Sequence, residues 1–290
     1  MSISTLSWRR ADLCRVPILV VAMLAAVTAN DAGVTSSVVV NSLEPDFLDR
    51  FSIHNAPSGA VSSFLDVDDI PNYGDFHATG TAAAGFRTLG GSAQVLTPFY
   101  TPAAFDSSTL IQTQSTFSDS LTLGGSGTGF VRFSFHLSGN AANSHPDILR
   151  SYVTFIFNAA GDRRLGLFSG SLGFYPTGTF VTSLIPVTFG QAFDLDGYLE
   201  TGVQGSSLNH EGAMVSGIYF GNTATLSTVE VFDALRQPLS GVVMSAASGT
   251  DYSAQVVPLP GTALLFLSGL AMCIARQRLL KPVRHGAAHT

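Results

Sequence analysis

Two short acidic runs carry the side chains best suited to binding a metal ion. Asp66, Asp68 and Asp69 lie in "DVDD", and Asp194 and Asp196 lie in "DLDG". Carboxylates spaced by two residues also begin Ca²⁺-binding loops, but such loops need further oxygen ligands and a distal glutamate, which neither run supplies. We therefore expect solvated turns at both places, with these five aspartates as the calcium candidates and no other cofactor.

Other motifs that resemble catalytic ones lack an essential residue. "HEGAM" begins like a zinc-protease helix at His210, but Met214 stands where the second histidine ligand is required. "GGSGTG" at 124–129 has no lysine after it, so we expect a turn between strands rather than a phosphate-binding loop. The chain also has no G-x-S-x-G nucleophile motif. The sequence therefore predicts no catalytic residue and a protein that is not an enzyme.

Charge and cysteine content separate the middle of the chain from its two ends. Of the 14 lysines and arginines, three precede the first apolar run and four follow the last, so the middle holds seven arginines against 19 acidic residues, a formal net charge of −12. Such a surface repels nucleic acid, which excludes DNA and RNA as partners. Cys14 and Cys273 both lie in the end segments. The middle can therefore form no intramolecular disulfide and holds no thiol nucleophile.

The first 29 residues have the pattern of an export signal. Three arginines precede an apolar run over 16–27, and small residues follow it. This order matches a secretory signal, so we expect a signal helix that signal peptidase removes between Ala29 and Asn30. A retained membrane anchor is the alternative, but this run is short for crossing about 30 Å of hydrocarbon.

The region 30–255 has the pattern of an antiparallel β protein. Runs rich in β-branched and aromatic residues are separated by glycine-containing turns. In "VRFSFHL", for example, Val131, Phe133, Phe135 and Leu137 fall on one face of the expected strand. We predict an all-β domain, an antiparallel β-sandwich or jelly-roll-like fold. The predicted strands lie within 36–43, 129–139, 151–161, 164–175, 179–189, 212–221, 223–235 and 239–249.

The final segment, 256–290, combines a proline motif, an apolar run and a basic tip. The motif is Val257-Pro258-Leu259-Pro260, followed by Gly261. The apolar run over 261–275 predicts a short transmembrane helix. The tip at 276–290 carries Arg276, Arg278, Lys281 and Arg284. These charges would remain on the cytoplasmic side, which leaves the preceding domain outside the inner membrane.

This order of motif, helix and basic tip resembles the PEP-CTERM sorting signal of exported proteins of Gram-negative bacteria, in a V-P-L-P variant. The resemblance implies that an exosortase cuts the chain at or near 257–260. It further implies that the body is released or attached at the cell surface, often alongside exopolysaccharide. Segments 73–85, 115–139 and 220–252 look like segments that recur in uncharacterised secreted β proteins with this tail, which implies a fold and no activity. A C-terminal anchor that is never cut is the alternative.

Two classes of function remain open. The first is a non-enzymatic protein of the cell surface or extracellular matrix, anchored transiently in the inner membrane and associated with extracellular polysaccharide. The second is a secreted carbohydrate-binding module or glycan-active enzyme whose site is assembled across strands. Candidates for stacking on sugar rings in that second class are Tyr73, Tyr100, Tyr175 and Tyr198. We favour the first class, whereas a concave face with paired carboxylates or exposed tyrosines would favour the second.

Overall fold

The computed structural model describes residues 32–42, 50–68, 77–97, 108–144, 149–169, 177–206 and 214–253. The predicted signal segment with its cleavage site at Ala29 and Asn30 lies outside these residues, as does the predicted tail from 256 to 290. Every element of the described part is a strand, and no helix in it is long and apolar enough to cross a membrane.

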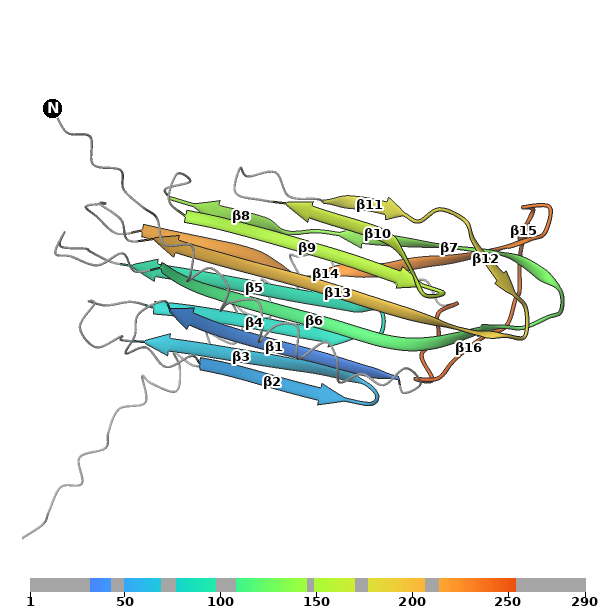
Figure 1. Ribbon diagram of the computed structural model, residues 1–290, viewed down its shortest axis with the longest axis horizontal. Coiled ribbons are helices and arrows are strands. Elements are labelled where there is room, and N and C mark those ends of the chain that lie inside the picture. The colour runs from blue at the N-terminus through green and yellow to red at the C-terminus, as the bar shows by residue number, and fades with distance from the viewer. Residues whose placement is uncertain are drawn as a thin grey trace, which may run out of the picture. The chain divides into compact units, whose positions relative to one another are not determined.

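The strands form two antiparallel sheets that face each other (Figure 1). Sheet A contains β1 (Gly33–Ser42), β2 (Arg50–Ala56), β6 (Ser108–Leu123), β9 (Leu149–Ala159), β10 (Asp162–Ser169), β13 (Ala192–Ser206) and β16 (Met244–Ala246). Its order is β10-β9-β13-β6-β1-β2, and β16 also pairs with β6. The prediction of an all-β, antiparallel, sandwich-like fold is confirmed.

Sheet B contains β3 (Ala60–Asp68), β4 (His77–Gly85), β5 (Thr88–Thr97), β7 (Thr128–Leu137), β8 (Asn140–Asn143), β11 (Gly178–Val181), β12 (Ile185–Thr188), β14 (Met214–Asp233) and β15 (Pro238–Leu239). Its order is β11-β7-β14-β5-β4-β3, with β12 beside β7, and β8 and β15 beside β14. Strands β4 and β5 face β6 and β1 of the other sheet, so the two sheets enclose one core.

Several strand predictions had the wrong boundaries, including 239–249, of which only Leu239 and 244–246 lie in strands. The runs 212–221 and 223–235 form the single strand β14, because a register shift between Phe220 and Ala224 lets the chain continue along β5. The run 179–189 is divided into β11 and β12, which both pair with β7. Between them, the Thr182 hydroxyl accepts a hydrogen bond from the Phe133 N–H at 3.1 Å, in place of a backbone acceptor.

The core contains large aromatic side chains on one side of the sandwich and small residues on the other. Between β7 and β9, Phe133 and Phe157 meet edge to face with 5.0 Å between ring centroids, and Phe135 lies 4.6 Å from Phe157. Between β4 and β1 the sheets approach closely at Gly80, where a Cβ atom would lie 2.5 Å from a Val38 methyl group. The alternation expected around Phe133 is confirmed, since its side chain and that of Phe135 are buried.

The last described segment, 244–253, is fastened to the sandwich, and we call it the C-terminal latch. Its strand β16 pairs with β6. Beyond β16, the Asp119 carboxylate accepts hydrogen bonds from the Ser248 N–H at 3.0 Å, the Ser248 hydroxyl at 2.5 Å and the Tyr252 hydroxyl at 2.9 Å. Arg87 donates to the Asp251 carbonyl at 2.8 Å. Asp119 and Tyr252 are buried, so the latch closes one end of the core.

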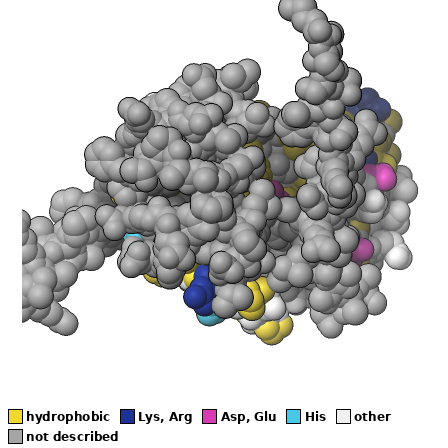
Figure 2. Space-filling model, turned by 60° about the vertical axis from the view of Figure 1, so that its left-hand side comes forward, with side chains coloured by type: hydrophobic (Ala, Val, Ile, Leu, Met, Phe, Trp, Pro, Cys, Tyr) yellow, Lys and Arg dark blue, Asp and Glu magenta, His cyan; other side chains and the backbone are white. Residues whose placement is uncertain are grey.

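Large exposed hydrophobic side chains lie on the terminal strands of both sheets. They are Phe51 on β2, Phe64 on β3, Phe168 on β10 and Val181 on β11. In Figure 2, hydrophobic side chains appear with a basic and a histidine side chain at the lower margin, the side on which β2 and β3 lie in Figure 1.

Candidate functional site

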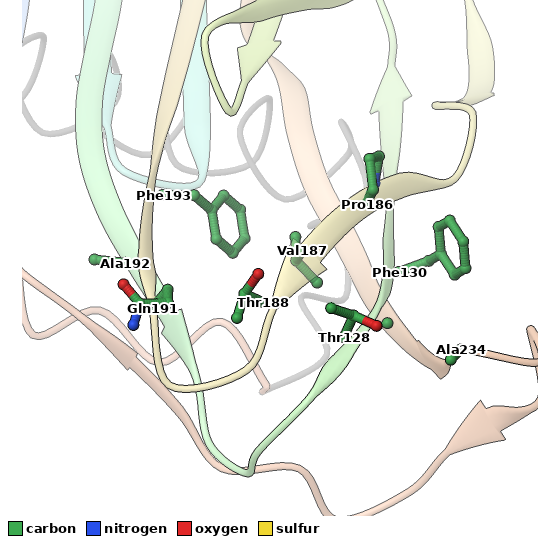
Figure 3. A pocket seen from close by; sticks show the side chains of 10 residues that line it. Thr128, Phe130, Pro186, Val187, Thr188, Gln191, Ala192, Phe193 and Ala234 are labelled. Carbon is green, nitrogen blue, oxygen red and sulfur yellow. The ribbon is translucent and has the colours of Figure 1, made fainter.

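A shallow pocket opens where the chain passes from sheet B to sheet A (Figure 3). Its volume is about 440 Å³. Strand β12 belongs to sheet B and β13 to sheet A, and the turn between them is closed by a hydrogen bond from the Gln191 N–H to the Thr188 carbonyl at 3.1 Å. The residues that line it are Thr128, Gly129, Phe130, Pro186, Val187, Thr188, Gln191, Ala192, Phe193 and Ala234. We call this the corner pocket.

The lining of the corner pocket is neutral. Its two aromatic rings, Phe130 and Phe193, lie on opposite sides of β12 in Figure 3. Arg236 covers one of them, with its guanidinium 5.4 Å from the centroid of the Phe130 ring. Ring faces combined with threonine and glutamine side chains suit a neutral ligand that stacks and forms hydrogen bonds. None of these lining side chains exchanges a proton near neutral pH.

A second polar and aromatic cluster lies on the outer face of sheet A, around Glu200. Glu200 stands between the buried residues Leu199 and Thr201 on β13, so its side chain points away from the core. On the same face, the ring and hydroxyl of Tyr152 lie over Gly202, where a Cβ atom would be 2.4–2.5 Å from three Tyr152 atoms. Glycine at 202 therefore leaves the space that the Tyr152 ring and hydroxyl occupy.

Hydrogen bonds join this cluster across three neighbouring strands. Tyr198 donates a hydrogen bond to Glu200, and the Gln114 amide lies at 3.5 Å from the same carboxylate oxygen. Burial raises the pKa of Glu200 above its ordinary value, although hydrogen bonds from Tyr152, Gln112 and Gln114 favour the charged form. Burial, followed by the charge of Glu200, also raises the pKa of Tyr152. We call these five residues the Glu200 cluster: Gln112, Gln114, Tyr152, Tyr198 and Glu200.

The predicted calcium run "DLDG" lies within a strand. Asp194 and Asp196 belong to β13, opposite Ser120 and Ser118 of β6, so the prediction of a turn here is wrong. The pattern was ambiguous because the leucine between the aspartates is a core residue of β13: Leu195 is fully buried. Carboxylates two residues apart fit the outer face of a strand, where they alternate with core residues, as well as the start of a calcium loop.

The other acidic run lies on the opposite sheet. Asp66 is exposed on β3 and lies 3.6 Å from the Nδ1 atom of His77. Asp68 ends β3, so a strand rather than a turn runs through this part of the motif, and Asp69 lies outside the described residues. The two acidic runs are therefore on different sheets. In the part of the chain that the structure describes, no three His, Cys, Asp or Glu side chains are grouped to hold a metal ion.

The remaining sequence candidates have different outcomes. The glycine-rich segment at 124–127 connects β6 to β7, which confirms the predicted turn. Tyr198 joins the Glu200 cluster, whereas Tyr73, Tyr100 and Tyr175 lie outside the described residues. Residues 210–213 of "HEGAM" also lie outside them. The sequence did not single out Tyr152 or Glu200, because strand pairing between β9 and β13 is what brings them together.

Comparisons with known proteins assign no family to the chain. No protein-family model matches it, and no curated protein matches it. Among solved structures, it is similar to a carbohydrate-binding module of the β-sandwich superfamily, from a study of promiscuous specificity in such modules. The sequence identity is 13%, the match covers 67% of this chain and 92% of that chain, and the TM-score is 0.14. A TM-score this low assigns neither a fold family nor a ligand.

Proposed function

We propose that this chain is an exported, non-enzymatic protein of the cell surface or extracellular matrix. Signal peptidase removes residues 1–29, the C-terminal helix holds the protein transiently in the inner membrane, and an exosortase then cuts at or near 257–260. The released or surface-attached product is the β-sandwich, which acts alongside extracellular polysaccharide. The absence of cysteine from 30–255 suits this route, because such a domain folds in an oxidising compartment without disulfide exchange.

The observation that carries this proposal is the position of the C-terminal latch. Tyr252 is buried and donates a hydrogen bond to Asp119, and Val257, the first residue of the motif, follows five positions later. A cut at or near 257–260 would therefore leave every contact of the latch intact. A cut upstream of Tyr252 would instead remove a buried side chain from the core and destabilise the product.

The proposal is tested by replacing the two prolines of the motif. A Pro258→Ala, Pro260→Ala variant expressed in the native host should keep its tail and stay in the membrane fraction. The matched control is Pro57→Ala, which changes an exposed proline in the β2–β3 turn and should be processed normally. Intact mass and cell fractionation report the result. Normal cutting and release of the double variant would overturn the sorting proposal.

A second candidate function, binding of a neutral polysaccharide, is favoured by the Glu200 cluster. The Tyr152 ring lies over Gly202 on the outer face of sheet A, and hydrogen bonds join Tyr198, Glu200 and Gln114 beside it. Aromatic rings stack on sugar rings, while carboxylate and amide groups form hydrogen bonds with sugar hydroxyls. The net charge of −12 over the middle of the chain disfavours an acidic polysaccharide.

This second candidate is tested on the processed protein by affinity electrophoresis through gels that contain a neutral or an acidic polysaccharide. Tyr152→Ala should abolish any retardation by the neutral polysaccharide. The control is Tyr219→Ala, because Tyr219 lies over Gly217 on sheet B and its loss should leave retardation unchanged. Equal retardation of both variants and the wild type would exclude the Glu200 cluster as the binding site.

A further inference from the structure

Both sheets end on the same side of the sandwich, at β2 and β3. Strand β2 is the last strand of sheet A, and β3 is the last strand of sheet B. The two strands are joined by the turn at 57–59 and lie side by side (Figure 1). Within the described residues, β2 pairs only with β1, and β3 pairs only with β4. Among the described residues, no strand pairs with the outer backbone groups of β2 or β3, and we call this side the β2–β3 edge.

Each strand of this edge carries one exposed phenylalanine. Phe51 is the second residue of β2, and Phe64 is at the centre of β3. Phe51 is 66% exposed and Phe64 is 60% exposed. Phe64 is adjacent to the buried Ser63, so it points away from the core on the outer side of sheet B. Phe51 pairs with Val39, which alternates with the buried Val38 and Val40, so it lies on the outer side of sheet A. The edge thus has one exposed ring on each of its two faces.

The opposite side of sheet A has the features that usually prevent edge association. Strand β10 has a register shift between Arg163 and Leu165, and it begins with three charged residues at 162–164. In contrast, the β1–β2 and β3–β4 ladders run without a register shift. Bulges and charges, especially lysines, are the common protection of edge strands, and 30–255 contains no lysine. Strand β2 is therefore the less protected of the two terminal strands of sheet A.

The charge of the β2–β3 edge also permits two copies to meet there. Strands β2 and β3 together carry Arg50, Asp66 and Asp68, a formal net charge of −1. The rest of the middle region accounts for most of its net charge of −12 and would repel a second copy elsewhere. Arg50 is the first residue of β2, so the centre of that strand contains no lysine, arginine or acidic residue.

We propose that the β2–β3 edge binds a second copy of this chain, forming a two-fold symmetric dimer in which β2 pairs antiparallel with β2 of the partner. An antiparallel strand pair has its two-fold axis perpendicular to the sheet, so the same rotation brings the two β3 strands together. Both sheets then continue across the dimer, with Ile53 of β2 facing its own counterpart at the two-fold axis and the exposed Phe51 and Phe64 rings on the outer faces beside the new strand pairs. The surface is self-complementary, as a two-fold interface requires.

The first test measures the oligomeric state of the processed protein by sedimentation velocity over a range of concentrations. We expect a monomer–dimer equilibrium that a Phe51→Asp, Phe64→Asp variant weakens at least about tenfold in Kd. The control is Phe168→Asp on β10, whose side chain is 61% exposed, and it should leave the equilibrium unchanged. Circular dichroism establishes that all three proteins are folded. A wild-type protein that stays monomeric, or that forms open-ended filaments, overturns the proposal.

The second test uses the absence of cysteine from the domain. In a Cys14→Ser, Cys273→Ser background, Ile53→Cys places one thiol at the centre of β2. Residues that face each other in an antiparallel pair have Cα atoms about 4.5–5.5 Å apart, within the range of a disulfide. Mild oxidation should therefore give a disulfide-linked dimer, whereas Phe168→Cys in the same background should not. Efficient cross-linking at position 168 but not at 53 would show that two copies meet through β10 rather than through β2, which overturns the proposal.

Discussion

The C-terminal latch and the β2–β3 edge are two margins of the same sandwich with opposite chemistry. In the latch, Asp119 is 3% exposed and accepts hydrogen bonds from Ser248 and Tyr252. At the edge, by contrast, Phe51 and Phe64 are exposed and the outer backbone groups face no described strand. The difference teaches that a buried carboxylate ties down the segment that must stay folded after the proposed cut. Open strands remain where we propose that a second copy binds.

Among the contacts of the two margins, the largest effect should come from removing the carboxylate of the latch. Asp119→Ala removes the acceptor of the Ser248 N–H and leaves the Ser248 and Tyr252 hydroxyls only their second acceptors, the Thr250 hydroxyl and the Phe86 carbonyl. We therefore expect a loss of about 2–3 kcal/mol in the free energy of unfolding. Urea unfolding of the processed protein measures it. Asp194→Ala on the outer face of sheet A is the control, and it should change stability by less than about 0.5 kcal/mol. Equal losses in both variants would mean that the latch does not stabilise the domain.

A smaller loss should follow from Tyr252→Phe. The ring stays packed against the core, and only the hydroxyl that donates to Asp119 at 2.9 Å is removed. Because Ser248 still donates to the same carboxylate, we expect a loss of about 1–2 kcal/mol. Urea unfolding beside Asp119→Ala gives the comparison. A loss as large as that of Asp119→Ala would show that the hydrogen bond of the Tyr252 hydroxyl accounts for the whole contribution of Asp119 to the free energy of unfolding.

The smallest effect should be seen at the edge. At concentrations low enough for the monomer to predominate, Phe51→Ser should change the free energy of unfolding by less than about 0.5 kcal/mol, because the side chain is 66% exposed. Phe157→Ala is the contrast, since its ring is fully buried against Phe133 and Phe135, and it should cost about 3–5 kcal/mol. A clear loss for Phe51→Ser in the monomer would show that this residue serves folding rather than association.

The aromatic side of the core was predictable from sequence because its residues alternate cleanly. In β7 and β9, bulky apolar side chains recur at every second position, and those of Phe133 and Phe155 are fully buried. Period-two alternation with large residues is the clearest strand pattern that a single sequence offers. Both strands were predicted for this reason.

The glycine- and alanine-rich side of the core was not predictable in the same way. Strands β4 and β5 read "HATGTAAAG" and "TLGGSAQVLT", compositions that favour turns. These strands exist because the sheets approach closely here: a Cβ atom at Gly91 would lie 2.4 Å from the Thr113 hydroxyl oxygen. Small residues are required by the facing sheet, and a local pattern does not contain that information.

The candidate sites depend even more on long-range pairing. The Glu200 cluster joins residues of β6, β9 and β13, and the latch joins Asp119 to a tyrosine 133 positions later. One local signal was present, since Tyr198, Glu200 and Gly202 alternate with core residues along β13. Sequence alone could not show which neighbouring strand supplies Tyr152.

The intact mass of the mature protein isolated from its native host tests the central claim most directly. The account predicts a chain that begins at Asn30 and ends at or near 257–260, with the C-terminal latch complete. A mass that retains 261–290 would contradict cleavage at the motif. A chain that ends before Tyr252 would contradict the claim that the cut leaves the sandwich whole.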